Sequence, residues 1–376
     1  MQKQSAMRIA VKRTEGAEGA WDSSPRIEAG SVAARPDPAE QIELWPWNRV
    51  LEGAGRQLDQ YISLEPKVLK GRDPDAIHDI RVASRRLQQV LDLVYPPPGP
   101  AKVRPKVQKI RRTIRRSRRA LSEVRNCDVL LERAGRILAR KRAARREVWT
   151  AFRDFVQERR DKSFRKASRR LSKLNLPALY LRLRELLEPP APPTGQADSP
   201  GEETNLRRRM TESLQETWAS LAGCVIQARE MPEAPSLHAV RIAAKKVRYL
   251  LEVAQALEVP GSAEAVATLR RLQTHLGDWH DLEVQDEMML EMIGQEGFLT
   301  DRLELAMDVE RLVLRNRKSK FGYVEQFLRM TGGSQEWLQL SGWVRDFLAN
   351  GGAGGDASRQ TGEEEPQSPA LPPPRA

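Results

Sequence analysis

Cysteines, aromatic residues and long apolar runs are all scarce in this chain of 376 residues, and each scarcity excludes a class of protein. The two cysteines, Cys127 and Cys224, form no C-x-x-C pair, which excludes a disulfide framework and a cysteine zinc site. No apolar run approaches the roughly 18 residues of a membrane helix, and residues 1–31 contain no apolar signal core. We therefore expect a cytoplasmic protein with no membrane span.

Signatures of known catalytic sites are also missing from the sequence. It contains no G-x-x-x-x-G-K-[ST] phosphate loop, no H-E-x-x-H zinc motif and no G-x-S-x-G nucleophile motif. An acidic cluster at Asp281, Glu283, Asp286 and Glu287 stands among many arginines, so we interpret these side chains as salt-bridge partners or helix-start charges. We expect no enzymatic activity and no cofactor.

Basic residues are what the sequence has in excess. The net charge is +12, but residues 101–173 alone hold 27 basic and 7 acidic side chains, a net charge of +20. Such a density predicts a polyanionic partner. The chain is also rich in Ala, Leu, Arg and Glu and has few alternating runs of β-branched residues, which predicts an all-α fold.

Shifts in composition divide the chain into folded and unfolded parts, because the stretches that separate them are polar or rich in Pro and Gly. The predicted order is a disordered extension at 1–38, a first half at 39–187, a linker at 188–203, a second half at 204–349 and a disordered tail at 350–376. Inside the halves, the periodicity predicts a long helix at 125–173 and separate helices at 262–276 and 279–294.

Two sequence motifs occur once in each half. The segment HDIRVASRRL, which begins at His78, reappears 160 residues later as HAVRIAAKKV, which begins at His238. The segment LSEVRNCDV, from Leu121, is matched 155 residues later by LGDWHDLEV, from Leu276. Two copies of a multi-helix unit predict a pseudo-twofold protein, in which equivalent helices can line one shared surface.

The first motif places basic residues on one face of a helix. At about 100° per residue, His78, Arg81 and Arg85 share a narrow face, and the second copy groups its equivalents in the same way. The second basic face consists of His238, Arg241, Lys245 and Arg248. The predicted buried faces are Ile80, Ala83, Leu87, Leu91 and Val94 in the first helix and Val240, Ala243, Val247, Leu251 and Ala254 in the second. Basic helix faces are usually solvated surfaces, but a face with histidine that occurs twice favours an anion site.

Residues 101–121 form a further basic element. Ten of the eighteen residues from Lys102 to Arg119 are basic, and one apolar stripe is predicted to be buried. That stripe consists of Val103, Val107, Ile110, Ile114 and Leu121. The side chains that point away from it are Lys109, Arg112, Arg116 and Arg119. Like charges at i,i+4 repel unless counter-charge is present, so we expect a bound polyanion along this helix.

All four histidines, His78, His238, His275 and His280, fall in the repeated motifs. His275 and His280 point about 140° apart on a helix, and the cations beside His78 and His238 would repel a divalent metal. We therefore expect no metal site. A neutral histidine beside arginine can donate a hydrogen bond to a phosphate oxygen, and a bound polyanion favours its charged form.

Taken together, these motifs resemble the CHAD domain, the conserved-histidine α-helical domain. The matching segments are H-x-x-R-V-x-x-R-R-L from His78, H-x-x-R-I-x-x-K-K-x-R-Y-x-x-E from His238 and L-G-D-W-H-D from Leu276, and the resemblance covers most of residues 39–349. It implies an all-helical fold of two pseudo-symmetric helical bundles around a basic central groove. This groove is expected to bind inorganic polyphosphate, often at polyphosphate granules in bacteria. By the same resemblance, the phosphate contacts are His78, Arg81, Arg85 and Arg86 in the first half and His238, Arg241, Lys245, Lys246 and Arg248 in the second.

The chain departs from the family pattern in two ways. Relatives often carry a preceding triphosphate tunnel domain, whereas this sequence has no E-x-E-x-K signature and resembles the stand-alone form. Asn126 stands where the second copy has Asp281, and Ala120 stands opposite His275. We therefore expect the two halves to contribute unequally to the site.

The leading hypothesis is a non-enzymatic polyphosphate-binding protein at polyphosphate granules. An alternative is nucleic-acid binding through residues 101–173, although residues 101–148 lack the aromatic side chains on which single-stranded bases usually stack. A further alternative is a phosphohydrolase or its accessory subunit.

Overall fold

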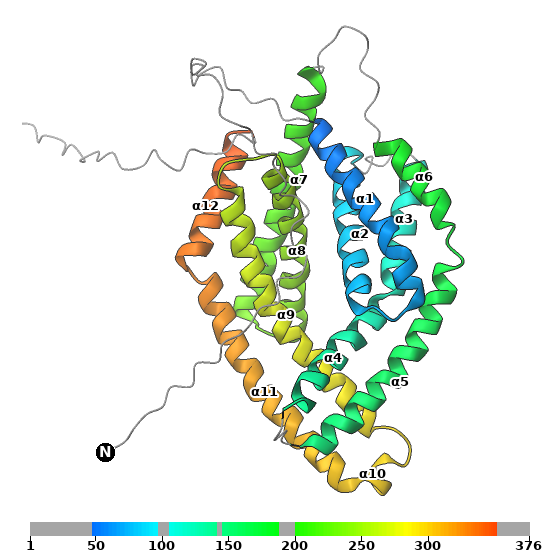
Figure 1. Ribbon diagram of the computed structural model, residues 1–376. Helices are drawn as coiled ribbons and strands as arrows, with labels where there is room; N and C mark the ends of the chain where they lie inside the picture. Colours follow the sequence, from blue (N-terminus) through cyan, green and yellow to red (C-terminus); the bar gives the residue numbers. More distant parts are fainter. Residues whose placement is uncertain (1–46, 97–104, 141–144, 188–199, 352–376) are drawn as a thin grey trace, which may run out of the picture. The chain divides into compact units, whose positions relative to one another are not determined.

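The structure, a computed structural model, is built from α-helices (Figure 1). It describes residues 47–96, 105–140, 145–187 and 200–351, and no strand occurs within these ranges. All of them belong to the unit Leu44–Ala376. The all-α expectation is therefore confirmed. The predicted extension at 1–38 lies outside the described residues, as do 188–199 of the predicted linker and 352–376 of the predicted tail.

Helices follow one another along the described residues of both halves. Those before the predicted linker are α1 (Trp47–Lys70), α2 (Pro74–Val94), α3 (Pro105–Ala120), α4 (Ser122–Leu138), α5 (Arg146–Leu171) and α6 (Leu176–Leu187). Those after it are α7 (Pro200–Glu230), α8 (Ala234–Ala256), α9 (Ser262–Ile293), α10 (Phe298–Asp301), α11 (Leu303–Thr331) and α12 (Gln335–Ala349). Helix α7 begins at Pro200, so the last four residues of the predicted linker are helical.

Two helix predictions were wrong. The single helix expected at 125–173 is two helices, α4 and α5, which pack against each other and bury Leu130 and Phe152 in one cluster. One continuous helix could not make that contact with itself. The two helices expected at 262–276 and 279–294 are one, because α9 continues through Gly277, whose neighbours Leu276 and Trp279 are buried. Packing thus overrides the low helix propensity of glycine.

Helices α2 and α8, which carry the two copies of the first motif, begin with similar signals. Pro74 and Pro235 lie in their first turns, where proline is favoured. Asp73 caps α2 by accepting hydrogen bonds from the backbone N–H groups of Asp75 and Ala76, at 3.1 and 3.0 Å. At the start of α8, the backbone N–H of Glu233 donates to Ser236 Oγ at 3.1 Å. Side-chain caps of this kind stabilise a helix by about 1 kcal/mol each.

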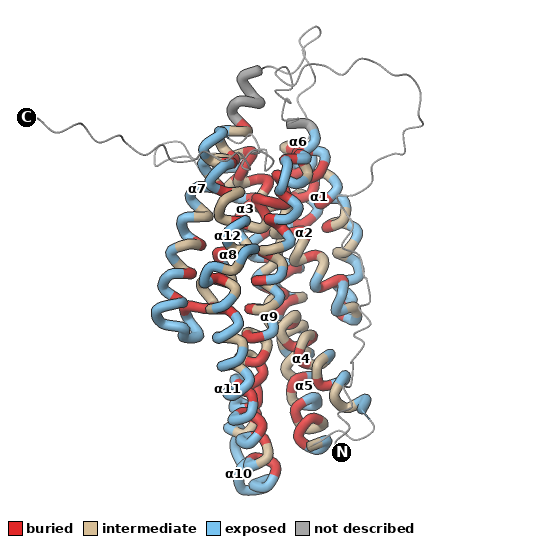
Figure 2. Tube along the Cα trace, turned by 90° about the vertical axis from the view of Figure 1, so that its left-hand side faces the viewer, coloured by how far each residue is buried: buried red, intermediate tan, exposed pale blue. Residues whose placement is uncertain are grey.

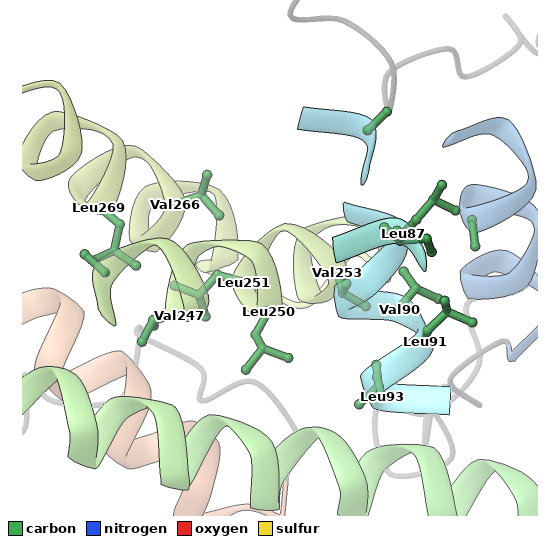
Figure 3. Packing of buried hydrophobic residues seen from close by; sticks show 14 of the residues in the cluster. Leu87, Val90, Leu91, Leu93, Val247, Leu250, Leu251, Val253, Val266 and Leu269 are labelled. Atoms are coloured by element: carbon green, nitrogen blue, oxygen red, sulfur yellow. The ribbon is translucent and has the colours of Figure 1, made fainter. Parts of the chain in front are cut away.

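The predicted apolar faces of α2 and α8 are buried at every position. In α2 these residues are Ile80, Ala83, Leu87, Leu91 and Val94, and in α8 they are Val240, Ala243, Val247, Leu251 and Ala254. Figure 3 shows Leu87 and Leu91 of α2 in the same packed region as Leu250, Leu251 and Val253 of α8. The basic faces of both helices must therefore point away from this core.

The buried apolar residues form two clusters. The larger one joins α1, α2, α3 and α6 to α7, α8, α9 and α12, so it includes helices from both halves of the chain. The smaller one is built from α4, α5, α9 and α11 (Figure 2). Helix α9 supplies Leu276 and Trp279 to the first cluster and Met288, Met289 and Met292 to the second. The part of α9 between these residues carries the second motif.

Helix α5 is fixed against the turn between α1 and α2. Gly71 has a φ of +69°, and a Cβ atom there would lie 2.3 Å from the Phe164 ring, so only glycine fits. Arg160 donates to the carbonyl oxygen of Gly71 at 2.8 Å and pairs with the buried Asp128 at 2.5 Å. These contacts hold α4 and α5 beside the start of α2, where the first basic face begins.

Candidate functional site

A hollow of about 650 Å³ lies between α2, α4, α8 and α9. We call it the basic pocket because five cationic side chains line it among the residues described. Arg81 and Arg85 come from α2, Arg125 comes from α4, and Arg241 and Lys245 come from α8. Segments more than 150 residues apart in the sequence thus direct their positive charges into one space.

None of these five cations forms an ion pair within the part of the chain that the structure describes. Arg81 instead donates to the carbonyl oxygen of Arg118 at 2.6 Å and to Ser122 Oγ at 2.9 Å. Arg241 Nε is buried and has no hydrogen-bond partner among the described residues. Buried or crowded cations without counter-charge are costly, so the pocket is prepared for an anion.

The pKa values of the pocket cations reflect this crowding. Burial, followed by repulsion from Arg241 and Arg85, lowers the pKa of Lys245 from 10.5 to about 6. Burial and then Arg85 lower the pKa of Arg81 to about 9. The pKa of Arg241 is also lowered by burial, against the opposing effect of Asp281. Each shift means that the pocket without a ligand disfavours the charged form, and a bound anion would reverse this effect.

Two histidines also line the basic pocket, and a third lies beside it. His78 and His280 are among the lining residues, and the ring centroid of His280 lies 5.2 Å from that of His238. Burial and the neighbouring cations, chiefly Arg125, lower the pKa of His78 to about 4, although part of this residue is exposed. Burial and then Arg241 lower the pKa of His280 to about 4. Both rings are therefore neutral at pH 7 and can each donate one hydrogen bond.

His275 lies apart from the other histidines. Its Nε2 is 2.7 Å from the carbonyl oxygen of Tyr323, and its ring packs against the Tyr323 ring. It contacts α11, whereas His280 of the same helix faces the basic pocket. In the described residues, no group of three or more histidine, cysteine, aspartate and glutamate side chains could hold a metal ion.

The two walls of the pocket differ in charge. The wall from α2 and α4 contributes Asn126 beside its arginines, whereas the wall from α8 and α9 contributes Asp278 and Asp281. Burial raises the pKa of Asp281, and Arg241 opposes that rise. An anion in the pocket is therefore attracted more strongly to the α2 and α4 side.

The structure separates the predicted site residues into three groups. His78, Arg81, Arg85, Arg241 and Lys245 line the basic pocket, and His238 contacts His280 at its edge. A second group does not line it. Arg86 and Arg248 lie 3.2 and 3.7 Å from the buried Glu252, and Lys246 is exposed to solvent. The third group, Lys109, Arg112, Arg116 and Arg119, is exposed along α3.

Arg125 and Asn126 are pocket residues that the sequence analysis did not select. A signal was available, because Arg125 and Asn126 occupy the same places in the second motif as His280 and Asp281. The acidic cluster was interpreted correctly in part. Glu283 and Asp286 both pair with Lys320, at 2.6 and 2.8 Å.

The helical fold and the pocket define a class of all-α protein in which cationic side chains gather between helices. A family model described as the CHAD domain matches residues 52–290, and the chain belongs to that family. The match lies inside the predicted range of 39–349. A solved structure, "Crystal structure of the CHAD domain from the plant Ricinus communis", is similar in fold, with a TM-score of 0.54 and 20% identity over 77% of this chain and 92% of that one. No curated protein matches the chain. Among the residues described, no helix is long and apolar enough to cross a membrane.

Proposed function

We propose that this protein is a non-enzymatic binding module for inorganic polyphosphate, and that the basic pocket holds a stretch of the phosphate chain. The supporting observation is that five cations line one pocket without ion pairs in the described structure. Membership of the CHAD domain family, which is associated in general with polyphosphate binding, supports the same ligand. In the cell, the protein would then be found at polyphosphate granules.

The repeated motifs support two pseudo-symmetric bundles around a shared groove. Residues at equivalent positions line the pocket from both halves. The equivalent pairs are Arg81 and Arg241, Arg85 and Lys245, Arg125 and His280, Asn126 and Asp281, and Val129 and Val284. A linear anion made of identical units suits such a site, because it presents the same chemistry to both walls.

Helix α3 offers a continuation of the binding surface for a longer polyphosphate. The Arg118 carbonyl, in the last turn of α3, accepts a hydrogen bond from Arg81 in the pocket. Lys109, Arg112, Arg116 and Arg119 are exposed on this helix. We assign them to the part of the polyphosphate that leaves the pocket, where salt would screen the contacts more strongly than inside it.

The pocket favours polyphosphate over single-stranded nucleic acid. No Phe, Tyr or Trp side chain lines it among the described residues, so it offers no platform for base stacking. Such stacking is worth about 1–3 kcal/mol per base in proteins that bind single strands. Competition provides the test: RNA that displaces polyphosphate at equal phosphate concentration would favour the nucleic-acid alternative. Release of phosphate from polyphosphate in the presence of divalent metal would instead favour a phosphohydrolase.

Charge reversal in the pocket tests the site. Arg85 and Arg241 are the best positions, because neither side chain makes a hydrogen bond or ion pair within the described residues. We expect the Arg85→Glu, Arg241→Glu variant to bind long-chain polyphosphate at least about 100-fold more weakly, since each reversal replaces attraction by repulsion.

The matched control is Arg169→Glu, Arg170→Glu, which changes the net charge equally at exposed positions on α5. It should change the affinity by less than about threefold if the site, rather than net charge, determines binding. Calorimetric titration measures both variants, and far-UV circular dichroism with thermal melting verifies their fold. Equal losses in the two variants would reject the pocket as the site.

A further inference from the structure

A second hollow, of about 370 Å³, lies at the end of α9 and along α10 and α11, and it is apolar. Its lining includes Leu290 of α9, Leu299 of α10, and Leu303, Met307 and Leu314 of α11. All five are exposed, from 45% at Met307 to 60% at Leu303. Large apolar side chains gathered on one exposed surface indicate a site of protein association.

The exposed side of α11 has the spacing of a coiled-coil seam. Its members follow one another at intervals of 4, 3, 4, 3 and 4 residues: Leu303, Met307, Glu310, Leu314, Arg317 and Phe321. All six are exposed to solvent. The opposite side of α11, with Leu305, Val309 and Leu312, is already buried in the smaller cluster. A second apolar stripe at the 3.5-residue period is typical of a helix that packs on another helix.

Two charged residues on this stripe indicate which molecule packs against it. Glu310 and Arg317 interrupt the apolar residues, and neither forms an ion pair within the described part of the chain. They lie two turns apart, at about 10 Å along the helix axis, so they cannot pair with each other. One acid and one base on a single stripe are self-complementary, because a second copy in the opposite direction presents them in the reverse order.

Antiparallel pairing of two α11 helices about a twofold axis level with Leu312 places every seam position opposite a seam position of the partner. Leu303 then faces the partner's Phe321, Met307 faces the partner's Arg317, and Glu310 faces the partner's Leu314. In this register Glu310 also lies within one helical turn of the partner's Arg317. The seam from Leu303 to Phe321 is about 27 Å long, at about 1.5 Å per residue.

We infer that the exposed face of α11, together with Leu290 and Leu299, is the interface of a homodimer. Its partner is a second copy of this chain in antiparallel orientation. The lining residues of this hollow differ from those of the basic pocket, so the inference does not depend on the proposed function. Leu290 and Leu299 widen the contact beyond the seam, toward the roughly 800 Å² per partner that stable interfaces bury.

Substitution of exposed seam residues tests the interface without disturbing the core. Sedimentation equilibrium of the full chain should show a dimer for the wild type. For Met307→Glu, Leu314→Glu we expect a dissociation constant at least about 100-fold higher, because four carboxylates would be buried per dimer. Ile226→Glu on α7 is the matched control, since Ile226 is 59% exposed and lies outside the seam. It should leave the dimer intact.

Charge exchange tests the orientation. Glu310→Arg and Arg317→Glu should each weaken self-association at least about tenfold, because each brings like charges within one helical turn of one another. An equimolar mixture of the two variants should restore the dimer, since every contact again joins opposite charges. A monomeric wild type at all concentrations would overturn the inference. So would a dimer that survives Met307→Glu, Leu314→Glu, or a monomer whose apolar face binds lipid vesicles instead.

Discussion

Lys245 combines burial and repulsion more strongly than its neighbours in the basic pocket. Its pKa of about 6 means that the side chain is mostly neutral at pH 7 when the pocket holds no ligand. A phosphate chain beside it favours the ammonium form and raises its pKa. Binding therefore takes up a proton wherever the pH lies between the two pKa values. The pocket gains positive charge as its ligand arrives.

This coupling predicts a pH dependence of polyphosphate binding. As the pH falls from 8 to the free pKa of about 6, affinity should rise by up to about tenfold per pH unit, and below 6 the contribution of Lys245 should level off. Calorimetric titrations in buffers of different ionisation enthalpy measure the proton uptake directly. The sign follows from the lowered pKa of the free protein. The pocket histidines His78 and His280 have a pKa of about 4 without ligand, so they take up a proton in this window only where the ligand raises their pKa above 6.

Lys245→Arg provides the matched comparison, because arginine keeps its charge across this pH range. In that variant we expect a flatter pH profile and less proton uptake. Lys246→Arg, at an exposed position one residue later, should behave like the wild type. An identical pH profile in Lys245→Arg and the wild type would show that another group takes up the proton.

At the scale of helices, Glu252 connects three elements. Its side chain is 6% exposed and lies 3.2 Å from Arg86 of α2, 3.7 Å from Arg248 of α8 and 3.6 Å from Arg270 of α9. Arg86 and Arg248 are themselves largely buried. Removal of the one carboxylate would leave two cations without a counter-charge in a region that already holds many cations.

Glu252→Gln should therefore destabilise the fold by about 3 kcal/mol, the usual scale for breaking a buried ion pair. Urea unfolding measures this change as a lower transition midpoint at a constant m-value. Asp154→Asn is the control, because Asp154 pairs with Arg153 on the surface and its side chain is 62% exposed. Its effect should stay below about 0.5 kcal/mol. A similar small change in Glu252→Gln would mean that water compensates the two arginines.

The sequence predicted helix faces well and helix neighbours less well. Periodicity was sufficient for the buried faces of α2 and α8, since a 3.6-residue repeat reports which side of a helix is apolar. It could not report that Arg86 turns toward Glu252, because that contact depends on how α2 and α8 approach each other. Arg248, by contrast, pairs with Glu252 one turn further along the same helix. Arg125 was missed for a related reason. The sequence predicts one helix over 125–173, whereas Arg125 belongs to α4, which packs against the separate helix α5.

At the scale of the whole described unit, the two halves of the chain share their cores. The larger cluster contains residues of α2 and α8, and the smaller one contains residues of α4 and α9. Neither half can bury its apolar surface without the other. The basic pocket likewise takes its walls from both halves, so the arrangement that stabilises the fold also assembles the site.

A chain cut between the halves should therefore remain assembled. With a protease site introduced between Leu187 and Pro200, complete cleavage should leave two fragments that elute together in gel filtration and still bind polyphosphate within about threefold of the uncut protein. The reason is that the shared cores, rather than the covalent connection, hold the pocket walls together; the lost linker changes mainly chain entropy. Uncut protein that carries the same inserted site is the control. Fragments that separate without denaturant, or that stay together but lose binding, would show that the connection itself orders the pocket.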